Sequence, residues 1–229
     1  VTNMKKIITC LLTLSMMFMF SATAFASDFS GNAESELSNI SDKIVTAVND
    51  VYSDKNISIT AEDINYDSAF KIYVDTNVFK LSTNVAGEIE NALENGNYIY
   101  LLPIDTVNGT VVVNFQKGLP LSENAKAILS EEEQQEVLDN AGKWVISSLA
   151  LYKNGNSNYD YEKKLSSIID EIPADTILVG GLPIFQDVVA LIPNSDGRVG
   201  QNAGGGSVRT KEDGNRLYAG KNDGCLYND

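Results

Sequence analysis

Residues 98–116 read YIYLLPIDTVNGTVVVNFQ and carry the strongest local fold signal in the chain. Two runs rich in β-branched and aromatic residues, 98–104 and 110–116, are joined through an Asn-Gly pair at 108–109. Asn-Gly is the pair that tight hairpin turns prefer, because both central turn residues need a positive φ. The stretch therefore predicts an antiparallel β-hairpin.

Helical and strand patterns alternate on both sides of this hairpin. Apolar residues spaced three and four apart predict helices, and alternation of apolar and polar residues predicts half-buried strands. The predicted helices cover residues 33–52, 84–94, 130–152 and 159–171, and the further strands cover 56–61, 69–75, 176–179 and 187–192. The third helix opens with a capping box, in which Ser130 and Glu133 satisfy each other's backbone amides.

The order of these elements is α-ββ-α-ββ-αα-ββ. Helix-plus-hairpin units in this order predict an α+β fold, with an antiparallel sheet built from hairpins and the helices packed on one face. The chain has 229 residues, which is long enough for one domain with a substantial core.

The first 26 residues match a secretory signal peptide. Met4-Lys5-Lys6 is a basic start, residues 7–20 are apolar and uncharged, and Ala24-Phe25-Ala26 is a small-residue cleavage pattern. Cleavage is predicted after Ala26, which places the mature protein outside the cell. The apolar run is shorter than a membrane span, and Cys10 lies inside it rather than at its end, so no lipid anchor is predicted.

Composition excludes several function classes. The chain has 17 Lys and Arg against 31 Asp and Glu, a formal net charge of −14, and no histidine. Acidity of this degree argues against nucleic-acid binding, and the missing histidine excludes Ser-His and Cys-His catalysis. Loss of residues 1–26 leaves Cys225 as the single thiol, so no internal disulfide is expected, and a dimer joined through Cys225 stays open. Such cysteine avoidance suits a bacterial secreted protein.

The mature chain divides at about residue 194. Residues 27–194 form the predicted acidic α+β domain and contain no arginine, whereas 195–229 are glycine-rich and charge-neutral. This tail is expected to be mostly disordered or peripheral. Two further interpretations stay open: a pair of short turn units that dock on a partner, and an incorrect reading frame at the end of the gene.

No catalytic, metal or cofactor motif emerges. The chain lacks G-x-S-x-G, and its Asp-Gly pairs fail the EF-hand spacing, so no metal and no cofactor are predicted. Paired carboxylates are the one catalytic class that the missing histidine leaves open. Asp75, Asp105, Asp160 and Asp187, at predicted element ends, are the candidates for such a pair.

Tyrosines are the other lead to function. Tyr98 and Tyr100 share one face of a predicted strand, and Tyr73 lies on another strand. Exposed tyrosines can stack on sugars or hold a peptide, so these three are the predicted binding residues, whereas Trp144 is expected in the core on a helix.

The leading hypothesis is a secreted, non-catalytic domain that binds a peptide, a cell-wall glycan or a protein partner outside the cell. The alternatives are a carboxylate-dependent extracellular hydrolase, and a structural or inhibitory module that adds a strand to a sheet edge.

Overall fold

The computed structural model describes residues 28–75, 78, 81, 85–94, 96–181, 188–193 and 216–219. The predicted signal peptide, Asp187, Cys225 and the tail apart from 216–219 lie outside the described residues.

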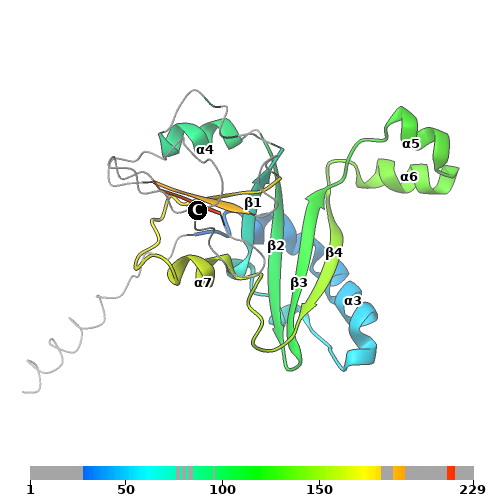
Figure 1. The fold of residues 1–229 in the computed structure, drawn as a ribbon. Helices are drawn as coiled ribbons and strands as arrows, with labels where there is room; N and C mark the ends of the chain where they lie inside the picture. Colours follow the sequence, from blue (N-terminus) through cyan, green and yellow to red (C-terminus); the bar gives the residue numbers. More distant parts are fainter. Residues whose placement is uncertain are drawn as a thin grey trace, which may run out of the picture.

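Seven strands in the described part of the chain form one sheet, in the order β4-β3-β2-β1-β5-β6-β7 (Figure 1). The strands are β1 (Phe70–Val74), β2 (Asn97–Thr106), β3 (Gly109–Lys117), β4 (Trp144–Tyr152), β5 (Ile177–Val179), β6 (Val189–Ile192) and β7 (Arg216–Ala219). Neighbouring strands are antiparallel except β1 and β5, which are parallel. The mostly antiparallel sheet with helices confirms the predicted α+β fold.

The predicted hairpin is formed by β2 and β3. Their register places Thr106 opposite Gly109, so the two central turn residues are Val107 and Asn108 rather than the Asn-Gly pair, and neither has a positive φ. Gly109 has φ +136°, and a side chain there would collide with the backbone carbonyl of Tyr152. Only glycine fits both the conformation and the close approach of β4.

The helices are α2 (Ala33–Leu37), α3 (Ser41–Tyr52), α4 (Ala86–Glu94), α5 (Glu123–Ile128), α6 (Glu131–Asn140) and α7 (Tyr161–Ser166). A 3₁₀ turn over Ser38–Ile40 splits the single helix predicted for 33–52 into α2 and α3. Further 3₁₀ turns cover Ser53–Lys55, Ala61–Asp63 and Tyr66–Ser68. The capping box of Ser130 and Glu133 opens α6 as predicted.

Helices lie on both faces of the sheet, not on one. On the first face, α2 and α3 bury Leu37, Ile44 and Val48 against β2 and β3, and α4 packs at the β1 and β5 side. On the second face, α7 buries Leu165 against the side chains of β1, β5 and β6 that point away from α4. These strands are apolar on both sides, as central strands are, and therefore need cover on both.

Residues 144–152 form β4 instead of the end of a helix. Gly142, with φ +72°, follows α6 and breaks the helical path. Beyond it, Trp144-Val145-Ile146 is rich in strand-forming residues and pairs with the end of β3. The apolar spacing here satisfies both a helical and a strand pattern, and the free pairing edge of β3 favours the strand.

Residues 56–61, predicted as a strand, have no strand partner in the described structure. The amide of Asn49 replaces one: it accepts from Ile59 N at 2.8 Å and donates to Ile59 O at 3.0 Å. Ile57 and Ile59 are nevertheless buried in the core, so their apolar pattern reflects burial without sheet pairing.

Candidate functional site

The three tyrosines predicted as a binding surface lie together, but under cover. Tyr73 on β1 pairs in register with Tyr98 on β2, with ring centroids 6.0 Å apart, and Tyr98 meets Tyr100 edge to face at 5.7 Å. Tyr100 is fully buried, Tyr73 is 8% exposed and Tyr98 is half-buried. The expected exposure is therefore wrong for Tyr73 and Tyr100, because α2 and α4 pack on the face that carries them.

Glu36 on α2 is the acceptor that joins these rings. Its carboxylate accepts hydrogen bonds from Tyr98 Oη at 2.8 and 2.9 Å, from Trp144 Nε1 at 2.9 Å and from Tyr100 Oη at 3.4 Å. Burial, reinforced by the Glu36 charge, raises the pKa of both tyrosines well above the ordinary value of 10.0. We call Glu36, Tyr98, Tyr100 and Trp144 the Glu36 cluster; it fastens α2 to β2 and β4.

Sequence reasoning had no signal for Glu36. The residue stands off the apolar stripe of its helix, where a solvated side chain is the ordinary expectation. Its donors are 62, 64 and 108 residues away along the chain. Trp144 was expected on a buried helix, but it begins β4, is half-buried and contacts both Tyr98 and Tyr100.

Two lysines lie over the same rings. Lys71 Nζ is 4.3 Å from the centroid of Tyr98 and 5.0 Å from that of Tyr73. Lys117 Nζ is 5.0 Å from the Tyr98 centroid and 5.3 Å from the Trp144 ring. Each cation–π contact contributes about 0.5–2 kcal/mol. The hydrogen-bonding groups and aromatic rings of the Glu36 cluster thus already have partners within the protein. This arrangement is typical of a cluster that stabilises the fold.

The β4 strand forms an open edge of the sheet. It pairs with β3 on one side, and no other described residue pairs with its second side. Its sequence, WVISSLALY, contains no charged residue, no proline and no glycine, and none of its nine residues is fully buried. Natural sheets usually protect such edges with charges, prolines or short strands. A register shift opposite Asn114 and Phe115 is the single irregularity of this ladder.

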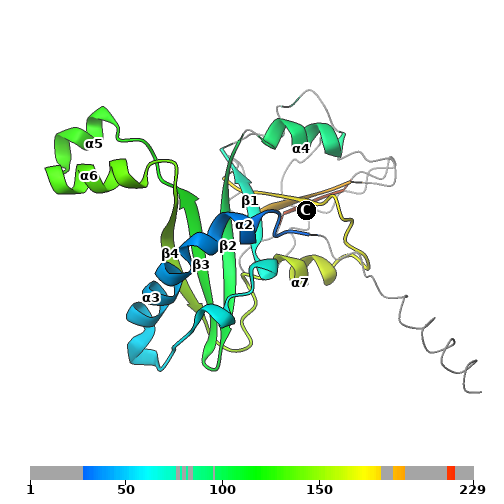
Figure 2. The ribbon, with the colours of Figure 1, turned by 180° about the vertical axis from the view of Figure 1, so that it is seen from behind.

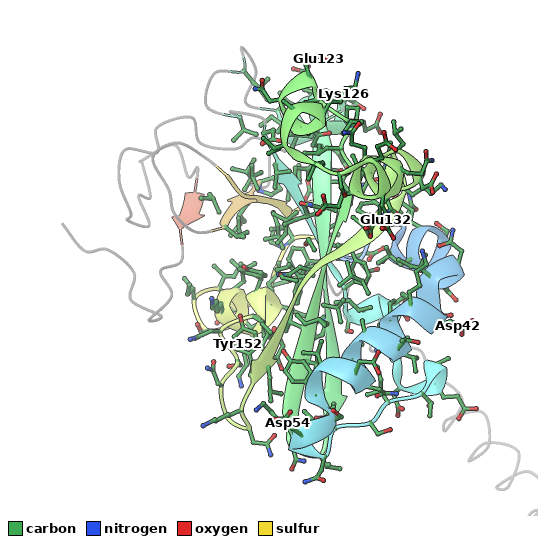
Figure 3. The ribbon with its side chains drawn as sticks, turned by 90° about the vertical axis from the view of Figure 1, so that its right-hand side faces the viewer. Asp42, Asp54, Glu123, Lys126, Glu132 and Tyr152 are labelled. Atoms are coloured by element: carbon green, nitrogen blue, oxygen red, sulfur yellow. The ribbon has the colours of Figure 1, made fainter. Side chains whose placement is uncertain are left out.

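Helical segments flank this edge. Figures 1 and 2 show α5 and α6 projecting past the β4 side of the sheet. Figure 3 looks onto the edge: β4 crosses the view obliquely from α6 toward Tyr152 at the lower left, α5 and α6 lie above it, and α3 lies beside it. An added strand would therefore run between α3 and the pair formed by α5 and α6.

The carboxylates proposed for hydrolysis have local roles. Asp105 accepts from Thr110 Oγ1 at 2.7 Å, Asp160 caps α7 through Lys163 N at 2.8 Å, and Asp75 accepts from the Asn97 amide at 3.2 Å. Among the described residues, no group of three or more Asp, Glu, His or Cys side chains is arranged to hold a metal ion.

A small cavity of about 110 Å³ lies elsewhere, on the β1 and β5 side of the sheet. The charged side chains in its lining are Asp28, Lys71, Glu90 and Asp175. It does not adjoin the β4 edge, because β2 and β3 lie between β1 and β4 in the sheet.

Comparisons with protein-family models, with curated proteins and with solved structures gave no match. Within the described residues, no helix combines the length and the apolar character needed to span a membrane.

Proposed function

We propose that this chain is a secreted, non-catalytic binding domain that takes up an extended segment of a partner protein by strand addition along β4. The observation that carries the proposal is the open, uncharged nine-residue edge of β4. Strand addition to such an edge is a general mode of peptide recognition, in which main-chain hydrogen bonds supply affinity and alternate side chains supply specificity.

The energetics favour an added strand. Each hydrogen bond that the β4 main chain makes to a partner contributes about 0.5–1.5 kcal/mol net. On the face toward α3, Trp144, Ile146 and Leu149 are packed against the core yet stay partly exposed. A neighbouring strand would remove the remaining apolar surface of these side chains from water, which adds a hydrophobic contribution.

Burial of the tyrosines argues for a peptide over a glycan. Stacking on a sugar requires an accessible ring face, and of the three predicted tyrosines only Tyr98 keeps partial exposure. The Tyr98 ring already carries the ammonium groups of Lys71 and Lys117.

The test uses the single tryptophan of the chain, Trp144, as a reporter, since it begins β4. The probe is a nine-residue peptide of alternating threonine and valine with charged residues at both ends. We expect saturable changes in tryptophan emission and slowed amide hydrogen exchange confined to β4. The matched control is the same peptide N-methylated at every residue of its threonine and valine centre, which removes the backbone donors from both of its edges. Equal protection of β4 by probe and control, or no protection by the probe, would exclude strand addition.

A further inference from the structure

We infer that the partner segment is basic, and that the helical hairpin of residues 119–142, which contains α5 and α6, is the acidic wall that recognises it. We call this segment the arm. The inference rests on the proposed function, because it assigns the chemistry of the strand that β4 would receive.

The arm is anchored firmly at its base. Gly118 N donates to Lys143 O at 2.8 Å, and Gly142 N donates to Gly118 O at 2.8 Å, so the β3 and β4 ladder continues up to the point where the arm leaves the sheet. A side chain at Gly118 would collide with the Asn140 carbonyl. The close approach of the two chains fixes the direction in which the arm projects.

The two helices of the arm are also fixed to each other. Gln134 on α6 donates through Nε2 to Leu129 O at 2.9 Å and to Lys126 O at 3.1 Å, at the end of α5. The arm is therefore a small preorganised unit, and a partner that binds it need not first order it.

The arm contributes nothing to the protein core. Neither α5 nor α6 contains a buried residue. Its apolar side chains face water instead: Ile128 is 82% exposed, Leu119 is 72% exposed and Leu138 is 51% exposed. Large apolar side chains gathered on an element that stabilises no core are typical of an interaction surface.

Charge specifies the partner of this surface. The arm contains six acidic residues against one lysine: Glu123, Glu131, Glu132, Glu133, Glu136 and Asp139 against Lys126, a formal charge of −5. Lys126 is already paired with Glu123 at 2.7 Å, and Glu133 is occupied by the capping box. Glu131, Glu132 and Glu136 are exposed, and none is in an ion pair with another described residue.

The position of the arm brings this charge to the edge. Figure 3 shows the arm above β4, with Glu132 on its lower helix, toward the strand. Lysine or arginine residues at one end of an added strand would meet these carboxylates, while its alternating middle pairs with β4. A second copy of this chain is a poor occupant, because each copy has a formal charge of −14.

The experiment compares two probe peptides with the same alternating threonine and valine centre, one with three lysines at each end and one with three glutamates. Their affinities are measured by Trp144 emission on the full chain. At low salt we expect the lysine peptide to bind about tenfold more tightly, with the difference shrinking as salt is raised.

Two matched variants distinguish an effect of the arm's carboxylates from an effect of the overall net charge of the protein. The arm variant carries Glu132→Gln, Glu136→Gln and Asp139→Asn. The control variant carries Glu162→Gln, Asp170→Asn and Glu171→Gln. The three control residues are exposed and lie in and after α7, on the sheet face opposite to α3. Each set removes three negative charges. We expect the arm variant alone to lose about fivefold or more of the lysine preference, because the lysine peptide binds more weakly and the glutamate peptide is repelled less.

The outcomes distinguish the two proposals. If neither peptide protects β4, strand addition itself fails. If both peptides bind β4 equally, or if the two variants lose the lysine preference equally, strand addition stands and the arm is not the acidic wall. If sedimentation shows that the chain alone pairs through β4 into a dimer, the occupant is a second copy and the basic partner is excluded.

Discussion

At the scale of single residues, Glu36 connects parts of the chain that no local pattern joins. Its carboxylate accepts hydrogen bonds from three side chains on β2 and β4, and one of these, Tyr100, is fully buried. A buried hydroxyl that loses its acceptor cannot recover the bond from water. Glu36 is therefore expected to matter more for stability than an ordinary residue on the polar side of a helix.

The first prediction is that Glu36→Ala lowers the free energy of unfolding by about 2–4 kcal/mol, because Tyr98, Tyr100 and Trp144 lose their acceptor together. Glu36→Gln keeps one acceptor oxygen, so about half that loss is expected. Urea unfolding followed by Trp144 emission measures both. A neighbouring exposed substitution, Glu34→Ala, is the control. A loss for Glu36→Ala no larger than the control would contradict the role of the cluster.

The second prediction concerns alkaline pH. Burial, with the Glu36 charge beside it, raises the pKa of Tyr98 and Tyr100 above 10.0, so the folded state favours the neutral phenols. This contribution is fully present below pH 10, the unfolded value, and is lost as pH rises from there toward the folded pKa. Unfolding measured between about pH 8 and 11 should show stability falling from pH 10 upward. Tyr100→Phe should make the decline shallower, and an unchanged slope would count against it.

At the scale of elements, β4 and the arm share one stretch of sequence but have different roles. The predicted helix over 130–152 contains both a real helix, α6, and a real strand, β4. The capping box is local chemistry between residues three apart, and it was predicted correctly. Residues 144–152 were assigned wrongly, because their apolar spacing fits two periods and the deciding partner, β3, begins 35 residues earlier.

The third prediction is that the arm is dispensable for folding. Replacing residues 119–142 by an Asn-Gly turn joins Gly118 to Lys143, whose backbones are already hydrogen bonded at 2.8 Å. Since α5 and α6 bury no side chain, the free energy of unfolding should change by less than about 1 kcal/mol. Chemical denaturation and circular dichroism would check this. A loss of several kcal/mol would mean that the arm is part of the core.

At the scale of the whole molecule, the sheet is covered unequally. Around β1, β5 and β6 both faces are packed, by α4 on one side and by α7 on the other. At the opposite end, no residue of the described ranges pairs with the outer side of β4, and the arm projects beyond that strand (Figure 1). The sheet is therefore well packed around β1, β5 and β6 and less protected along β4. This arrangement is expected when the edge strand serves an interaction.

The fourth prediction concerns processing. Phe29 is buried against Phe70, and its carbonyl accepts from Lys71 N at 2.7 Å, so the folded domain needs the chain from Phe29 onward. Cleavage after Ala26 leaves Phe29 in place. If the chain is secreted as proposed, N-terminal sequencing of the protein from the culture medium should begin at Ser27. A first residue beyond Phe29 would refute this cleavage site.

Local sequence was enough to predict the hairpin of β2 and β3, the capping box of α6, most helix positions and the α+β class, because each depends on residues within a few positions of one another. The boundary at residue 194 remains a prediction of the same kind. Long-range packing decided the rest. Burial of Tyr73 and Tyr100, the convergence on Glu36 and the free edge of β4 all depend on which segment covers which face. That choice is set by the free energy of the whole packed chain, which no short stretch of residues contains.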